Sequence, residues 1–158
     1  MSDTLLAGGR TLVFPDGLVG YPEWQRFELE ASPDGSPVAW LQGKDEEEAC
    51  FLVTEPALVC PTYEVDVPRH VRTALGLEAK QLPAMLCMLV VQPEPLTITA
   101  NLLGPIIYNP DNGLACQVVL ADSGYPARYP VVVTDPASAN STSIHTPGSR
   151  SAEGGAAC

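Results

Sequence analysis

Basic side chains are scarce in this sequence. Its 158 residues include 8 Lys and Arg against 19 Asp and Glu, which gives a formal net charge of −11 at pH 7. So few cations cannot neutralise a run of phosphates, and we therefore expect no direct binding to nucleic acid. The same imbalance disfavours docking on anionic membrane surfaces. It favours a basic protein partner, because an acidic field accelerates the approach of a positively charged surface.

Long hydrophobic runs and metal-binding spacings are also missing. The longest apolar run covers residues 84–91, less than half of the ~20 residues that a membrane-spanning helix needs. The first residues include Asp3 where a secretory signal would be basic, so we expect a cytoplasmic protein outside the membrane. The only histidines are His70 and His145, and no C-x-x-C pair is present. We therefore expect neither a metal nor another cofactor.

The five cysteines are scattered along the chain. In a reducing compartment, scattered cysteines are typically buried free thiols that pack like small hydrophobic residues. We expect this state for Cys50, Cys60, Cys87 and Cys116, and an exposed reactive thiol at Cys158.

The composition changes abruptly near Asp135. Residues 136–158 are rich in Ser, Gly and Ala, with Ile144 as their only large aliphatic residue. Such a segment cannot bury enough apolar surface to offset the entropy lost on ordering it. We therefore expect one folded domain over residues 1–135 and a disordered tail over residues 136–158.

Short apolar runs separated by turn residues predict a mostly β fold. Sixteen prolines make long helices unfavourable, and the spacing is typical of a β-sandwich or small barrel. The expected strands are residues 11–14, 26–29, 38–42, 49–54, 85–91, 96–101, 105–108 and 114–120. Residues 85–91 do not alternate, which predicts a central strand covered on both faces. Residues 96–100 alternate, which predicts one solvated face.

Two connections have clear signals. Residues 109–113 (Asn-Pro-Asp-Asn-Gly) predict a hairpin loop in which Asn112 and Gly113 supply positive φ angles. Residues 67–76 predict the one convincing helix, with Pro68 in its first turn and Gly76 as a left-handed cap. Its expected apolar face consists of Val67, Val71, Ala74 and Leu75.

Catalytic signals are weak. The G-x-S-x-G motif, the phosphate loop and the dinucleotide fingerprint are all absent. Ser123 lies in a dense turn signature, and His70 follows Arg69 in a position that favours solvation. Glu64 and Asp66 are two apart, so they could share one face of a strand as the paired carboxylates of a hydrolase. Solvated side chains before a helix explain them equally well.

The run Asp45-Glu46-Glu47-Glu48 predicts an acidic turn. Charge runs are usually solvated, and a cationic partner surface is the alternative use. The residues alone therefore indicate an acidic, β-rich module that binds protein, with no visible active site.

Four stretches together resemble one family. Residues 14–27 (FPDGLVGYPEWQRF) are similar to its Phe-x-x-Gly-(Ile/Leu)-Pro-Gly-Phe-Glu segment, with Val19 in place of the proline. Residues 61–68 (PTYEVDVP) resemble its proline-rich entry to a helix. Residues 99–109 (TANLLGPIIYN) and 120–130 (LADSGYPARYP) resemble its double strand and its closing Tyr-Pro-x-Arg-(His/Tyr)-Pro. The chain therefore resembles the flagellar assembly factor FliW family over roughly residues 10–131.

The resemblance implies a compact antiparallel β-barrel-like single domain with one short helix, followed here by the tail, and it implies that the protein is not an enzyme. Members of the family bind the translational regulator CsrA and prevent it from repressing flagellin mRNA. They also bind newly made flagellin, which then releases the regulator. The expected partners are CsrA and flagellin. The alternative is a small β-barrel that binds a small molecule or peptide in an enclosed apolar pocket.

The site residues that we take from this resemblance are of two kinds. The matched motif positions are Gly17, Gly20, Pro68, Asn101, Pro105, Asn109, Tyr125, Pro126 and Arg128. For most of these, turn geometry and strand packing compete with partner contact. We expect Asn101 to satisfy backbone groups where two strands part, and Arg128 to have a carboxylate or carbonyl partner. The candidate partner contacts are the carboxylates of Asp45, Glu46, Glu47, Glu48, Glu64 and Asp66.

Overall fold

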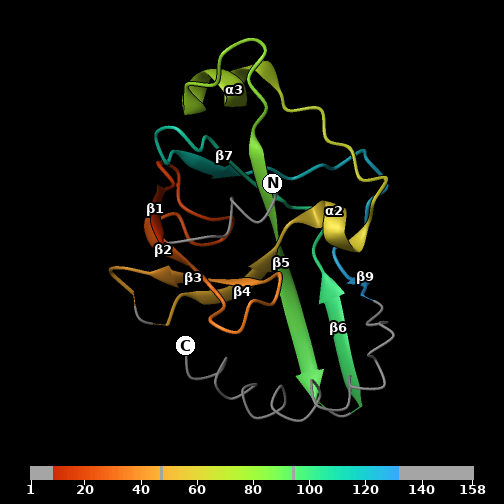
Figure 1. Cartoon of the computed structure of the whole chain (residues 1–158). Helices are drawn as coiled ribbons and strands as arrows, with labels where there is room; N and C mark the ends of the chain where they lie inside the picture. Colours follow the sequence, from red (N-terminus) through yellow and green to blue (C-terminus); the bar gives the residue numbers. More distant parts are fainter. Residues whose placement is uncertain (1–8, 47, 94, 132–158) are drawn as a thin grey trace.

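A curled antiparallel β-sheet forms the body of the protein (Figure 1). The computed structural model describes residues 9–46, 48–93 and 95–131. The strands are β1 (Arg10–Val13), β2 (Arg26–Ala31), β3 (Ala39–Gly43), β4 (Cys50–Thr54), β5 (Ala84–Pro93), β6 (Leu96–Ala100), β7 (Ile106–Tyr108), β8 (Ala115–Gln117) and β9 (Tyr129–Pro130). The helices are α2 (Pro56–Val59) and α3 (Arg69–Leu75). The mostly β, barrel-like fold that the sequence predicted is confirmed.

The sheet curls because β5 is shared by two sets of neighbours. The strand order is β1-β2-β3-β4-β5-β6-β9, and β7 pairs with both β5 and β8. A parallel bridge joins Val13 to Leu114, and the Val13 N–H donates to the Gly113 carbonyl at 2.8 Å. This bridge brings β1 against the start of β8. The strands β1 to β5, β7 and β8 therefore surround the main core, and β6 and β9 extend beyond it.

A local insertion separates β6 from β7 along β5. Leu89 pairs with Ala100, whereas Leu86 pairs with Ile106. Three steps along β5 thus match six steps along the opposite chain, so three extra residues must bulge out of the ladder. The Asn101 side chain fills this gap, because its Oδ1 accepts hydrogen bonds from the N–H groups of Leu103 (3.1 Å) and Gly104 (2.9 Å). This is the structural role that the sequence predicted for Asn101.

Alternating strand positions build the core. Phe27, Leu29 and Leu41 are fully or almost fully buried, whereas their strand neighbours Glu28 and Gln42 are half-buried. Burying each large apolar side chain contributes about 1.5–3 kcal/mol. Two further apolar clusters flank the main one: one lies around Tyr63 and Leu102, and the other lies beneath α3.

The loop between β1 and β2 is held in a fixed shape. Gly17 has φ +70°, and a Cβ there would overlap the backbone of Pro22. Leu18 and Tyr21 exchange backbone hydrogen bonds of 3.1 and 2.8 Å, which places Val19 and Gly20 at the tip. The Val19 N–H donates to the Gln117 side chain at 3.0 Å. Because a proline has no N–H to donate, this bond is available only with a residue such as Val19 at this position.

Several local predictions are wrong. Val90 in β5 is 53% exposed, so residues 85–91 are not covered on both faces, because β5 contributes only Ala84, Leu86 and the partly buried Met88 to the main core and then extends past it. The described residues contain two helices instead of one, and β9 was not expected. Ala74 is exposed rather than part of the apolar face of α3.

The hairpin loop and the helix end are partly as predicted. In residues 109–113 only Gly113 has a positive φ, of 78°. Asn112 instead uses its side chain, which accepts from the Leu114 N–H at 2.9 Å and donates to the Leu75 carbonyl at 3.1 Å. Gly76 ends α3 in the left-handed conformation with φ 73°, as predicted. The expected tail, residues 136–158, lies outside the described residues.

The cysteines differ from one another. Cys60 and Cys87 are buried free thiols, as predicted, and Cys116 is a half-buried one. Burial raises the pKa of Cys87 to about 12, so this thiol stays protonated. Cys50 is half-buried and is disulfide-bonded, so the prediction of a free thiol there is wrong. Cys158 lies outside the described residues.

Candidate functional site: a surface groove with acidic rims

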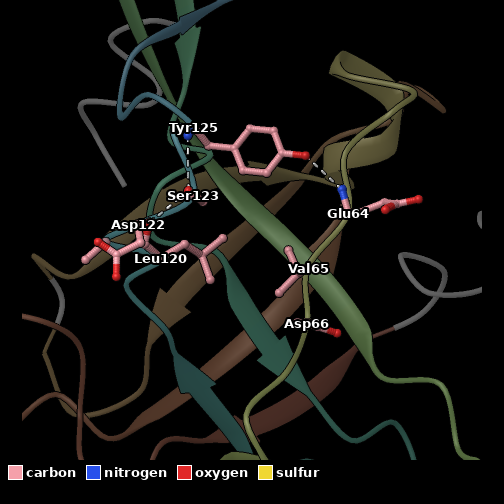
Figure 2. A pocket seen from close by; sticks show the side chains of 8 residues that line it. Glu64, Val65, Asp66, Leu120, Asp122, Ser123 and Tyr125 are labelled. Carbon is pink, nitrogen blue, oxygen red and sulfur yellow. Dashed lines mark hydrogen bonds between the residues drawn. The ribbon is translucent and has the colours of Figure 1, made fainter.

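Two of the motif stretches meet at a surface groove with a volume of about 680 Å³ (Figure 2). One wall is part of residues 61–68, the connection between α2 and α3. The other wall is the turn that begins at residue 120. The lining residues are Glu64, Val65, Asp66, Leu120, Ala121, Asp122, Ser123 and Tyr125. We call this feature the 64/120 groove.

Tyr125 joins the two walls. Its hydroxyl accepts a hydrogen bond from the Glu64 N–H at 3.0 Å. Its ring packs on the ring of Tyr63, with the centroids 4.5 Å apart. Tyr63 is itself anchored, because its hydroxyl donates to the Leu102 carbonyl at 2.7 Å. Burial is the main cause that raises the pKa of Tyr63, and the nearby Cys87, Tyr125 and Cys60 raise it further. The Tyr63 hydroxyl therefore stays protonated and remains a donor. The groove therefore has a rigid aromatic end.

Hydrogen bonds within the turn fix the second wall. The Ser123 hydroxyl donates to the Leu120 carbonyl at 2.8 Å and accepts from the Tyr125 N–H at 3.0 Å. The Ser123 N–H donates to the same carbonyl at 3.0 Å. The turn is also tied to the bulge after β6, because the Leu102 N–H donates to the Pro126 carbonyl at 3.1 Å. Ser123 is thus a turn residue, as predicted.

The first wall is an extended segment that pairs with none of the strands in the described residues. Val65 and Val67 are half-buried and pack on the apolar clusters, whereas Glu64 and Asp66 are exposed. This alternation is the period of a β-strand. Within the part of the chain that the structure describes, however, the N–H groups of Val65, Asp66 and Val67 have no hydrogen-bond partner.

The floor of the groove is apolar and its rims are acidic. In Figure 2 the Val65 and Leu120 side chains extend into the space between the two walls. The Glu64 carboxylate points away from Tyr125, and the Asp122 carboxylate points away from Leu120. None of the eight lining residues is basic. Glu64 and Asp66 do share one side of the segment, but they do not face a second carboxylate across the groove, so the geometry gives no support to a hydrolase.

The acidic turn between β3 and β4 is a separate feature. Asp45 forms a two-pronged ion pair with Arg26, at 2.6 and 3.0 Å. The hydrogen bond to Arg26 lowers the pKa of Asp45. Glu46 is half-buried, Glu48 is exposed and Glu47 lies outside the described residues. Figure 1 places this turn and residues 61–68 on opposite sides of the molecule, so the predicted acidic contacts do not form one surface.

Among the matched motif positions, Asn109 has a clear structural task. Its Nδ2 donates to the Leu75 carbonyl at 2.9 Å, at the end of α3. Its Oδ1 accepts from the Gln81 side chain at 3.0 Å and from the Asp111 N–H at 2.9 Å. It therefore clamps the helix to the loop of residues 109–113.

The remaining motif positions are mostly at turns and element ends. Pro68 is the N-cap of α3, and the carbonyl of the buried Pro105 accepts from the Val118 N–H at 3.0 Å. Gly20 has φ +88° and lies at the open tip of its loop. Arg128 is exposed and has no hydrogen bond or ion pair with any residue that the structure describes. The prediction of a partner for Arg128 is therefore wrong.

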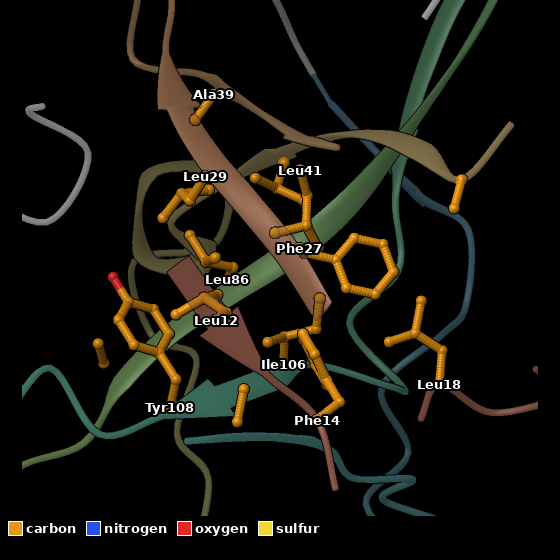
Figure 3. Packing of buried hydrophobic residues seen from close by; sticks show 14 residues of the cluster. Leu12, Phe14, Leu18, Phe27, Leu29, Ala39, Leu41, Leu86, Ile106 and Tyr108 are labelled. Carbon is orange, nitrogen blue, oxygen red and sulfur yellow. The ribbon is translucent and has the colours of Figure 1, made fainter. Parts of the chain in front are cut away.

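The barrel interior is solid. Phe14 and Phe27 pack edge to face with their centroids 5.3 Å apart, and Leu12, Leu86 and Ile106 fill the space around them (Figure 3). All five side chains have zero exposure. Within the described residues this interior leaves no room for the enclosed ligand that the alternative prediction requires. The 64/120 groove lies on the outside of the barrel.

The sequence did not predict the apolar floor of this groove. It selected Glu64, Asp66 and Tyr125 but not Val65 or Leu120, which supply the apolar floor. The available signal was the pair of motif stretches at residues 61–68 and 120–130, which their similarity to one family had already linked.

The fold and the groove define a small, barrel-like antiparallel β protein with an external, acidic-rimmed groove. The model of the family described as "FliW protein" matches residues 6–131. Flagellar assembly factor FliW 2 of Desulfotalea psychrophila is 33% identical over 120 residues, which cover 76% of this chain and 79% of that protein. Flagellar assembly factor FliW of Geotalea uraniireducens is 32% identical over 126 residues, covering 80% and 77% of the two chains.

A solved structure agrees with these sequence matches. The crystal structure of a flagellar assembly factor FliW superposes with a TM-score of 0.71 at 27% identity, over 79% of this chain and 87% of that chain. This chain therefore belongs to the FliW family of flagellar assembly factors. No helix in residues 9–46, 48–93 and 95–131 is long and apolar enough to cross a membrane, and those residues contain no group of three or more side chains suited to a metal.

Proposed function

We propose that this protein is a cytoplasmic, non-enzymatic binding protein that antagonises CsrA and binds flagellin. In this function the two partners exchange on the protein, so that free flagellin releases CsrA and limits its own synthesis. The observation that supports it most strongly is the 64/120 groove, because two FliW-like motif stretches form its walls and all its charged lining residues are acidic.

The charge of the protein suggests how antagonism works. CsrA binds RNA, so its RNA face must be basic. A docked protein with a formal net charge of −11 repels RNA phosphates through its field, even where it leaves the RNA site uncovered. Antagonism by this route needs both contact at the groove and negative charge on the rest of the surface.

Co-purification tests the proposed function directly. The full chain, immobilised, should retain purified CsrA, and added flagellin should displace CsrA in proportion to its concentration. If CsrA is not retained, or if it remains bound while flagellin also binds, partner exchange is wrong.

A second experiment tests the electrostatic route. The exposed carboxylates of Glu30 and Glu78 lie outside the groove and outside the candidate contacts, so Glu30→Gln and Glu78→Gln should weaken the protection of mRNA from CsrA more than they weaken CsrA binding. Equal losses of protection and binding across a salt series would contradict this route.

A further inference from the structure

We propose that the 64/120 groove binds an extended peptide segment, which pairs with residues 64–67 as an added β-strand. In this arrangement apolar side chains of the peptide pack against Val65 and Leu120, and its basic side chains lie at the acidic rims. This inference rests on the proposed function, because it names the kind of segment through which a protein partner docks.

The backbone of the first wall supports strand addition. Residues 64–67 alternate between exposed and half-buried positions, as a strand does, but no strand of the described sheet pairs with them. Because successive N–H groups of an extended segment point to opposite edges, the Asp66 N–H lies on the same edge as the Glu64 N–H, which faces Tyr125, and it finds no partner among the described residues. Unpaired strand edges are the surfaces at which extended peptides add by main-chain hydrogen bonds.

The segment is fixed before any partner arrives. Pro68 follows it directly, and a proline favours an extended conformation of the residue before it, here Val67. The Glu64 N–H is held by the Tyr125 hydroxyl at 3.0 Å, and the Tyr63 hydroxyl holds the Leu102 carbonyl at 2.7 Å. A surface that is ordered in advance loses little conformational entropy on binding. The free protein therefore already presents a strand edge.

The groove also determines the chemistry of its occupant. Its volume of about 680 Å³ lies within the 300–1,000 Å³ usual for binding sites. Its floor is formed by Val65 and Leu120, and its rims by the exposed carboxylates of Glu64, Asp66 and Asp122. A peptide that alternates apolar and basic residues matches both features. A second copy of this chain would bring a further net charge of −11 to the same surface, which disfavours self-association.

Synthetic peptides separate main-chain pairing from charge attraction. The probe is acetyl-Lys-Val-Lys-Val-Lys-amide, titrated into the full ¹⁵N-labelled chain and followed by NMR. We expect saturable binding with shifts concentrated in residues 64–67 and 120–125. The same peptide with the backbone nitrogens of all five residues methylated keeps its charge but loses the donors on both strand edges, so it should bind at least tenfold more weakly. The acidic peptide with Glu in place of Lys should not bind.

A pair of substitutions provides the matched test in the protein. Asp66→Ala removes one rim carboxylate and keeps the N–H, whereas Asp66→Pro removes both and keeps an extended φ. Asp66→Pro should lower the affinity for the peptide at least fivefold more than Asp66→Ala does. The methylated peptide needs no variant, so it tests the inference even where Asp66→Pro is unstable.

The outcomes distinguish this inference from the proposed function. Equal binding of the methylated peptide, shifts located elsewhere, or no saturation would overturn strand addition, even where CsrA and flagellin still bind. Binding of the peptide at residues 64–67 by a chain that retains neither CsrA nor flagellin would uphold strand addition and refute the proposed function.

Discussion

The hydroxyl of Tyr125 accepts a hydrogen bond of 3.0 Å from the backbone N–H of Glu64, which lies 61 positions earlier in the chain. This bond ties the extended segment before α3 to the turn that follows β8. The 64/120 groove lies between these two segments, so its shape depends on the contact. The tyrosine is also a matched position of the FliW-like closing motif, which gives that motif a physical task.

Tyr125→Phe should loosen the groove while leaving the fold intact. The substitution removes the acceptor for Glu64 and keeps the ring packed on Tyr63. We expect the free energy of unfolding to fall by about 0.5–1.5 kcal/mol, measured by urea denaturation, and exchange of the Glu64 amide to accelerate. Tyr21→Phe is the matched control, because Tyr21 is exposed and its hydroxyl has no hydrogen bond among the described residues. Equal effects of the two variants would contradict the role of Tyr125.

Asn101→Ala should destabilise the bulge between β6 and β7. Two backbone N–H groups, those of Leu103 and Gly104, lose their acceptor in this variant. Leaving such groups unpaired costs about 1–3 kcal/mol, which urea denaturation would detect. Asn101→Asp retains an oxygen acceptor and should lose less. A wild-type unfolding midpoint for Asn101→Ala would show that the side chain is dispensable.

Gly17→Ala and Gly20→Ala form a matched pair in the first loop. Both glycines have a positive φ, of 70° and 88°, but only at Gly17 would a Cβ overlap the backbone of Pro22. Gly20→Ala should therefore cost about 1–2 kcal/mol, the usual cost of the left-handed conformation. Gly17→Ala should cost clearly more, as measured by thermal and urea unfolding. The reverse order would mean that the loop differs from the one described.

The stability of the turn between β2 and β3 should depend on acidic pH. The Ser32 hydroxyl and the Ser36 N–H donate to Asp34 Oδ1 at 2.6 and 2.9 Å. These bonds lower the pKa of Asp34 to about 2 from its ordinary value of 3.8, and the bond from Ser32 has the largest effect. Because the folded state binds this proton more weakly than the unfolded state does, the stabilisation is complete above pH 4 and decreases as the pH falls toward 2.

NMR titration of the Asp34 carboxyl checks this directly, and a midpoint near 4 would be inconsistent with the hydrogen bonds. The stability difference between wild type and Asp34→Ala should shrink over the same pH range. Lys44 and its partner Glu28 at 3.5 Å form an exposed ion pair, and Lys44→Met serves as a control that leaves the Asp34 turn in place.

Local signals account for most of the elements that the sequence predicted. The strands near Phe27, Leu41 and Ile106 have apolar residues bounded by turn residues, and the helix ends at a glycine. Such signals depend on neighbours within a few residues, so they can be read without the fold. The same is true of Asn101, whose acceptor reaches only two and three residues along the chain.

Non-local contacts explain what the sequence did not predict. The two-residue strand β9 exists because the chain returns to Thr99 and Ala100, and its proline gives no strand signal. Closure at Val13 and Leu114 is a single bridge across a hundred positions. The groove likewise combines Val65 with Leu120, which no local pattern connects.

Hydrogen exchange of the full chain, alone and saturated with CsrA, tests the central claim most directly, because it locates the contact surface on the intact protein. We predict that CsrA slows exchange at residues 64–67 and 120–125, and that flagellin added in excess reverses this protection as it displaces CsrA. Unchanged exchange in both segments, with protection at the acidic turn between β3 and β4 instead, would contradict the assignment of the groove as the binding site.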